Sequence, residues 1–128
     1  MFSLDKKVQL SFEGTIQRLT EELKKEGFGI LTQIDIKDTL KKKIDQDFQP
    51  YIILGACNPH FASKALSLND KIGVFLPCNI VVQQHADDQV QISIGDPEEM
   101  MKAASNPALM SLAHNVKKSM ERVLSNIS

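Results

Sequence analysis

The chain has 128 residues, of which 42% are hydrophobic and 24% are charged, and its formal net charge is −1. This composition is typical of one globular domain with its own apolar core, and no apolar run approaches the ~20 residues of a membrane-spanning helix. The near-neutral charge provides no general attraction to nucleic acid or to an anionic membrane, so we expect neither as a partner.

The N-terminal residues predict a strand followed by a helix. Val8, Leu10 and Phe12 alternate with polar residues, which is the period of a strand with one buried face. Thr15 is expected to cap the start of the helix, and Gly27 is expected to close it.

A second pair of elements follows in the same order. Residues 28–34 predict a strand, and Asp35 is expected to cap a short helix whose outer face is heavily charged. The apolar stripe of this helix consists of Ile36, Leu40 and Ile44.

The centre of the chain predicts a strand that is covered on both faces. Tyr51 to Leu54 show no alternation of apolar and polar residues, as expected for a central strand. Asn58 and Pro59 then mark a helix start, with a capping residue followed by proline at the first helical position. We expect this helix to end near Asn69.

Three further strands are predicted after this helix. Residues 72–76 form a short apolar segment that Pro77 stops. Residues 80–85 and 90–94 flank the polar turn "ADDQ", which predicts an antiparallel hairpin.

The last part of the chain predicts two helices. Asp96 and Pro97 form the strongest helix start in the sequence, and Asn106 and Pro107 repeat the same signal. We therefore expect a short helix, a break and a long amphipathic C-terminal helix. Its apolar residues recur every three or four positions: Leu109, Leu112, Val116, Met120, Val123 and Ile127.

Together the elements follow the order β-α-β-α-β-α-β-β-β-α. This order predicts one α+β domain over residues 1–128, with a mainly antiparallel curved sheet packed by helices. The long C-terminal helix is expected to lie across the sheet.

The chain has two cysteines, one in "GACNPH" at residues 55–60 and one in "PCN" at residues 77–79. Cys57 precedes a helix start, where backbone N–H groups and the helix dipole stabilise a thiolate. His60, in the first turn of that helix, adds a nitrogen donor. If Cys78 comes close, these three side chains predict an open site for a soft metal ion such as zinc.

Asn58 and Asn79 lie next to the two cysteines and are expected to complete the two turns through backbone hydrogen bonds. If both turns share one rim of the sheet, they form a small polar pocket. The candidate ligand-binding residues are therefore Cys57, Asn58, Cys78 and Asn79, and the candidate metal ligands are Cys57, Cys78 and His60.

Three other interpretations of the cysteines stay open. They can be packing residues, because free cysteine is among the most buried residue types. They can form a redox pair if their Cα atoms lie within about 7 Å, or Cys57 can be the nucleophile of a thiol-based enzyme. Two cysteines do not form a secreted disulfide scaffold and no signal peptide is evident, so a reducing, cytoplasmic setting is expected.

No reaction is predicted from the remaining motifs. The sequence contains no glycine-rich phosphate loop, nucleophile elbow or metalloprotease motif. His85 is expected on the solvent side of the hairpin, and His114 at the edge of the apolar face of the last helix. Neither histidine is assigned a role.

The stretch "YIILGACNPHFASKAL", followed by "GVFLPCNIVVQQHADDQVQISIGDP", resembles the domain-of-unknown-function family numbered 302. The resemblance extends from about Val8 to about Val123. It implies a fold similar to the TATA-box-binding-protein-like α+β class and a homodimer, and it carries over no catalytic roles. A fold similar to that of a DNA-binding protein does not imply DNA binding.

The sequence therefore predicts a small, cytoplasmic, homodimeric binding protein without an assigned activity. Its expected ligand, at the Cys57 and Cys78 turns, is a soft metal ion or a small sulfur compound. The alternatives are a structural or interaction module whose cysteines only pack, and a thiol-based enzyme that uses Cys57.

Overall fold

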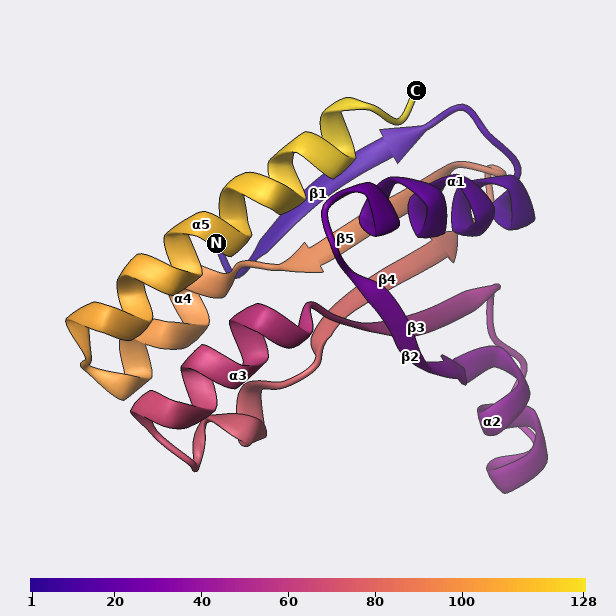
Figure 1. Ribbon diagram of the computed structural model, residues 1–128. Coiled ribbons are helices and arrows are strands. Elements are labelled where there is room, and N and C mark those ends of the chain that lie inside the picture. The colour runs from indigo at the N-terminus through magenta and orange to yellow at the C-terminus, as the bar shows by residue number, and fades with distance from the viewer.

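A computed structural model describes all 128 residues and has an α+β fold, in which a five-stranded antiparallel sheet is packed by helices (Figure 1). The strands are β1 (Ser3–Val8), β2 (Gly29–Asp35), β3 (Tyr51–Cys57), β4 (Cys78–Gln84) and β5 (Val90–Gly95). The helices are α1 (Phe12–Lys25), α2 (Ile36–Ile44), α3 (Pro59–Leu68), α4 (Pro97–Met101) and α5 (Pro107–Ser125), with 3₁₀ turns η1 (Ile72–Phe75) and η2 (Lys102–Ala104). The predicted fold class is confirmed.

One face of the sheet forms the main core. The strand order is β1-β5-β4-β3-β2, and every neighbouring pair is antiparallel. Fully buried residues alternate along β3, β4 and β5, so they share the face on which α1 and α5 pack. The principal core residues are Leu54, Ile80, Val82, Ile92 and Ile94 of the sheet and Leu19, Leu23, Met120 and Val123 of the helices.

The opposite face of the sheet is polar and partly exposed. Tyr51 and Ile53 point to it from β3 and are only half-buried. The prediction that this strand is covered on both faces is therefore wrong. Its unbroken apolar run has another cause: Ile52 and Leu54 fill the core, while their neighbours lie on an open face.

A lobe formed by residues 29–48, the β2–α2 lobe, stands at one edge of the sheet. Figure 1 shows α2 projecting away from the body of the molecule. None of the residues of α2 is buried, and β2 is an edge strand. As predicted, Asp35 caps α2, because its Oδ1 accepts the N–H of Asp38 at 2.9 Å.

The N-terminal elements differ from their predicted positions. β1 ends at Val8, and α1 already begins at Phe12. Ser11 caps α1, since its Oγ accepts the Gly14 N–H at 3.0 Å, whereas Thr15 is buried inside the helix. Phe12 packs against the core from the first turn of α1, so the alternation of apolar residues extends past the end of β1.

The segment predicted as a strand at residues 72–76 instead contains the 3₁₀ turn η1, Ile72–Phe75. Ile72 is buried and Phe75 packs beside it, a spacing of three that matches one 3₁₀ turn. The starts of α3, α4 and α5 agree with the predicted caps at Asn58, Asp96 and Asn106. None of the helices is both long enough and apolar enough to cross a membrane.

Candidate functional site

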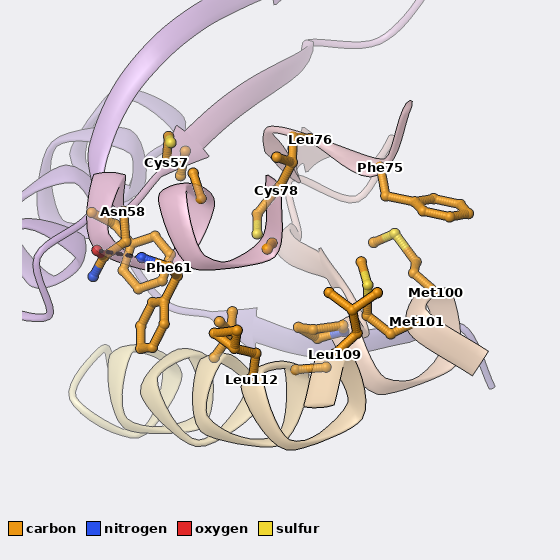
Figure 2. A pocket seen from close by; sticks show the side chains of 17 residues that line it. Cys57, Asn58, Phe61, Phe75, Leu76, Cys78, Met100, Met101, Leu109 and Leu112 are labelled. Atoms are coloured by element: carbon orange, nitrogen blue, oxygen red, sulfur yellow. Dashed lines mark hydrogen bonds between the residues drawn. The ribbon is translucent and has the colours of Figure 1, made fainter. Parts of the chain in front are cut away.

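An apolar pocket lies at the end of the sheet where β3 stops and β4 begins (Figure 2). It is bordered by α3, η1, α4 and the first half of α5, and its volume is about 60 Å³. Of its 17 lining residues, 15 are hydrophobic and none is charged. Ala56 and Cys78 of the sheet contribute to it beside Phe61, Met101 and Leu112 of the helices. The lining therefore suits an uncharged molecule.

Asn58 fixes the α3 side of the pocket. Its Oδ1 accepts the backbone N–H groups of His60 at 3.0 Å and Phe61 at 3.4 Å, which is N-cap geometry. Its Nδ2 donates to the Glu26 carbonyl oxygen at 3.4 Å and so joins the start of α3 to the end of α1. The ring of Phe61 then lies beside that of Phe28, with 6.1 Å between the ring centroids.

The two cysteines both border the pocket but belong to opposite faces of the sheet. Cys78 pairs with Ala56 in the β3–β4 register, so these two side chains share one face of the sheet. Cys57 is the next residue after Ala56, and its side chain therefore lies on the other face. Figure 2 shows the Cys78 side chain directed toward the helices and the Cys57 sulfur directed away from them. Both are free thiols.

Burial decides the protonation of Cys78. Its removal from water, together with the nearby Cys57, raises the pKa of the Cys78 thiol from 9.0 to about 11. At neutral pH the side chain is therefore an uncharged thiol inside an apolar lining. A protonated thiol is a weak nucleophile.

The other predicted site residues lie apart from the pocket interior. His60 is exposed in the first turn of α3, and Asn79 is exposed and points to the polar face of the sheet. No group of three or more His, Cys, Asp or Glu side chains is close enough to share a metal ion. The structure thus brings Cys57, Asn58 and Cys78 to one pocket and leaves His60 and Asn79 outside its lining.

Sequence reasoning missed the α4 side of the pocket. Met100 and Met101 line it, together with Leu109 of α5 and Phe75 of η1. The starts of α4 and α5 can be predicted from the sequence, because each consists of aspartate or asparagine followed by proline. The missing information was the direction in which the α4 methionines point, because a single-turn helix has too few residues to show a periodic apolar face.

Polar contacts hold α4 against α5. Asp96 caps α4 by accepting the Glu98 N–H at 3.0 Å, and it pairs with Lys117 Nζ at 3.0 Å. Burial alone would raise the pKa of Asp96, but the bonds from Lys117 and the Glu98 N–H outweigh it and hold that pKa below its usual value. A second link joins Glu98 to His114 at 3.1 Å. The wall that carries both methionines is thereby anchored.

Gly55 allows the rim of the sheet to close beside the pocket. It lies between Thr32 of β2 and Asn79 of β4. A Cβ at this position would collide with the Thr32 side chain and come within 2.7 Å of Pro77 Cγ. The glycine two residues before Cys57 is therefore required by close packing.

Comparisons with known proteins agree with this architecture. The sequence model described as "Domain of unknown function DUF302" matches residues 4–127. The fold is similar to the crystal structure of an uncharacterized conserved DUF302 protein from Bacillus stearothermophilus, with a TM-score of 0.93 and 35% sequence identity over 100% of this chain and 99% of that chain. No curated protein matches the sequence. Since the family match spans nearly the whole chain, the protein belongs to the DUF302 family.

Proposed function

We propose that the protein binds a small, uncharged, apolar molecule in the pocket between α3, α4, α5 and the end of the sheet. The observation that carries this proposal is the lining itself, in which 15 of 17 residues are hydrophobic and none is charged. A cavity of this kind favours apolar ligands because water gains few hydrogen bonds inside it.

Sulfur atoms narrow the class of ligand. Cys78, Met100 and Met101 line the pocket, and their sulfur atoms are soft and polarisable. Small sulfur compounds such as thioethers or thiophenes match this lining in both polarity and polarisability. The reducing, cytoplasmic setting expected from the sequence suits the proposal, because free thiols persist there.

A zinc site at Cys57, Cys78 and His60 stays a prediction. An open zinc site needs three protein ligands around one ion, with Zn–S bonds of about 2.3 Å. His60 is exposed while Cys78 is directed into the pocket, so a shared ion would need the start of α3 to rearrange. The geometry therefore favours the uncharged ligand over the ion.

The ligand proposal can be tested with thiophene and protein labelled with ¹³C at the methionine methyl groups. Thiophene should shift the Met100 and Met101 methyl resonances in a saturable manner and leave that of Met1, which is 92% exposed, unchanged. Ala62→Leu, which adds bulk inside the lining, should weaken binding about tenfold or more.

The matched control for this experiment is Ala108→Leu, which adds the same bulk to an exposed position outside the lining. This variant should bind thiophene as the unmodified protein does. The proposal fails if thiophene leaves the methyl groups of Met100 and Met101 unshifted, or if both leucine variants weaken binding equally.

A second candidate function is self-association through the β2–α2 lobe, with a second copy of the chain as the partner. Large apolar side chains are exposed there: Leu31 (68%), Ile34 (48%), Ile44 (63%) and Phe48 (38%). A helix of nine residues is marginal without tertiary packing, and an open edge strand presents unpaired backbone groups. A homodimer would cover both features at once.

The charges of the lobe are compatible with such a contact. Residues 35–47 contain four lysines and four aspartates, so two copies do not repel one another. Several of these charges are already neutralised within the chain, for example by the 3.0 Å pair of Lys42 and Asp38. The lobe therefore has no net charge, and contact between the apolar side chains of two copies is not opposed by electrostatic repulsion.

The double variant Leu31→Lys, Ile44→Lys should convert a dimer into a monomer, as measured by sedimentation equilibrium over a range of concentrations. The basic residue at position 44 fits the last turn of α2, so the helix itself should persist. The control is Val74→Lys on η1, where valine is 81% exposed, and this variant should remain dimeric. Dissociation of the Val74 variant, or a monomeric unmodified protein, would refute this interface.

A further inference from the structure

We propose that the open face of the sheet carries a second ligand site, specific for a neutral saccharide. This site is separate from the apolar pocket, because it lies on the face of the sheet opposite to the helices. It is a groove of about 380 Å³, formed mainly by residues of β1, β3, β4 and β5. Nothing in the proposed function of the apolar pocket depends on it.

Two side-chain amides in the groove present free donors side by side. Gln83 and Gln91 face each other across β4 and β5. The Oε1 of Gln83 accepts from Gln49 Nε2 at 2.8 Å, and the Oε1 of Gln91 is bonded to His85 Nε2 at 3.0 Å. Each glutamine is thereby oriented by its oxygen, and its Nε2 has no partner within the chain. This arrangement is suited to bind hydroxyl oxygens of a ligand.

The remaining lining offers the other contacts that a sugar needs. Ser93 and Asn79 supply further uncharged hydrogen-bonding groups, and Asp5 supplies an acceptor for hydroxyl hydrogens. Tyr51 supplies an aromatic surface for the C–H face of a pyranose ring, and Phe48 lies beside it at 5.8 Å between ring centroids. The amides and the carboxylate can therefore bind the hydroxyl groups of a sugar, while the aromatic ring of Tyr51 packs against its C–H face.

The charge of the groove disfavours anionic ligands, which also have many hydrogen-bonding groups. The lining contains neither lysine nor arginine, and Asp5 is its only charged residue. Asp5 therefore repels phosphorylated and acidic ligands, whereas the exposed Lys7, which is opposite Gln91 in the β1–β5 register, lies outside the lining. The complementary ligand is a saccharide without an ionised group.

The experiment uses the natural fluorescence of the protein. The chain has one tyrosine, Tyr51, and no tryptophan, so its intrinsic fluorescence reports on the surroundings of Tyr51, which lines this groove. The probes are methyl glucoside, methyl galactoside, N-acetylglucosamine and cellobiose, and glucuronic acid is the charged comparison. We expect a saturable fluorescence change with at least one neutral probe. We also expect shifts of the Gln83 and Gln91 side-chain NH₂ resonances in ¹⁵N-labelled protein, and binding of glucuronic acid at least about tenfold weaker.

Substitutions locate the binding. Gln83→Leu combined with Gln91→Leu removes both donors and should weaken binding about tenfold or more. Gln17→Leu, on the exposed surface of α1, makes the same chemical change away from the groove and should leave binding intact. If the double variant does not fold, Gln91→Leu alone provides the same comparison.

Three results would overturn the proposal: no response to any neutral probe in either measurement, equal binding of glucuronic acid, or equal weakening by Gln17→Leu. A dimer contact that buries the groove and blocks the probes would also overturn it, with a second copy of the chain as the true occupant. These outcomes are independent of thiophene binding in the apolar pocket, so either site can fail without the other.

Discussion

Replacing Gly55 by valine should destabilise the protein by about 1–3 kcal/mol or more, as expected for overpacking at a rigid site. The added side chain has no free space, because even its Cβ would collide with the Thr32 side chain and lie 2.7 Å from Pro77 Cγ. The backbone of Thr32 is held by its pairing with Gly55 in the β2–β3 register, and the ring of Pro77, directly before β4, is rigid. Denaturant unfolding, followed by circular dichroism, measures the effect.

Gly29→Val is the matched control for this substitution. Gly29 lies in β2, and a Cβ there would meet no atom within 4 Å. Its replacement should change the free energy of unfolding by less than about 1 kcal/mol, and it can be stabilising because valine restricts the unfolded chain. A rescue test uses Thr32→Ala, which removes one of the two colliding side chains and should recover part of the loss caused by Gly55→Val. Equal costs at Gly29 and Gly55 would show that close packing is not the reason for the glycine.

Cys78 should react with iodoacetamide at pH 8 about a hundredfold more slowly than a small free thiol. The rise of its pKa from 9.0 to about 11 lowers the thiolate fraction by that factor, and restricted access slows the reaction further. The rate is best measured by mass spectrometry in the Cys57→Ser variant, where Cys78 is the only thiol. Addition of denaturant should restore the rate of a free thiol.

The Cys78→Ser variant, in which Cys57 reacts alone, controls for the reagent and for the fold. Rapid modification of Cys78 in the native protein would mean that the pocket opens readily or that the thiol is activated. That result would remove the basis for an uncharged ligand, and it would revive a reactive role for this cysteine.

The same pKa shift predicts a loss of stability in alkali. The unfolded chain loses the Cys78 proton near pH 9, whereas the native state holds it until about pH 11. The free energy of unfolding should therefore be unaffected below about pH 9 and fall by about 3 kcal/mol as the pH rises to about 11. A Cys78→Ala variant should lack this component of the alkaline decline.

Local signals in the sequence were sufficient for most elements of the fold. Asp35, Asn58, Asp96 and Asn106 begin their helices as predicted, because a cap acts on backbone groups only two or three residues away. The predicted start of the first helix is wrong because local signals allow two caps, Ser11 and Thr15. The packing of Phe12 favours the cap at Ser11. That packing depends on residues far away in the sequence.

The candidate site was only partly accessible to sequence reasoning. The sequence leaves open whether the two cysteine turns lie close together, because the pairing of their strands depends on residues far apart in the chain. The β3–β4 pairing brings Cys57, Asn58 and Cys78 to one rim of the sheet. The side-chain directions could not be predicted, since a register shift of one residue exchanges the two faces of a strand. That single residue separates Cys78, which faces the helices, from Asn79, which faces the groove.

Because successive side chains of a strand point to opposite faces, the three consecutive residues 77–79 are constrained by three different parts of the structure. Pro77 restricts what position 55 can hold, Cys78 shapes the apolar pocket, and Asn79 belongs to the polar groove. Substitutions that are tolerated at one of these positions therefore give no guidance for the next. Among relatives, a different residue at position 78 would indicate a changed lining of the apolar pocket, and a different residue at position 79 would indicate a change on the opposite face of the sheet.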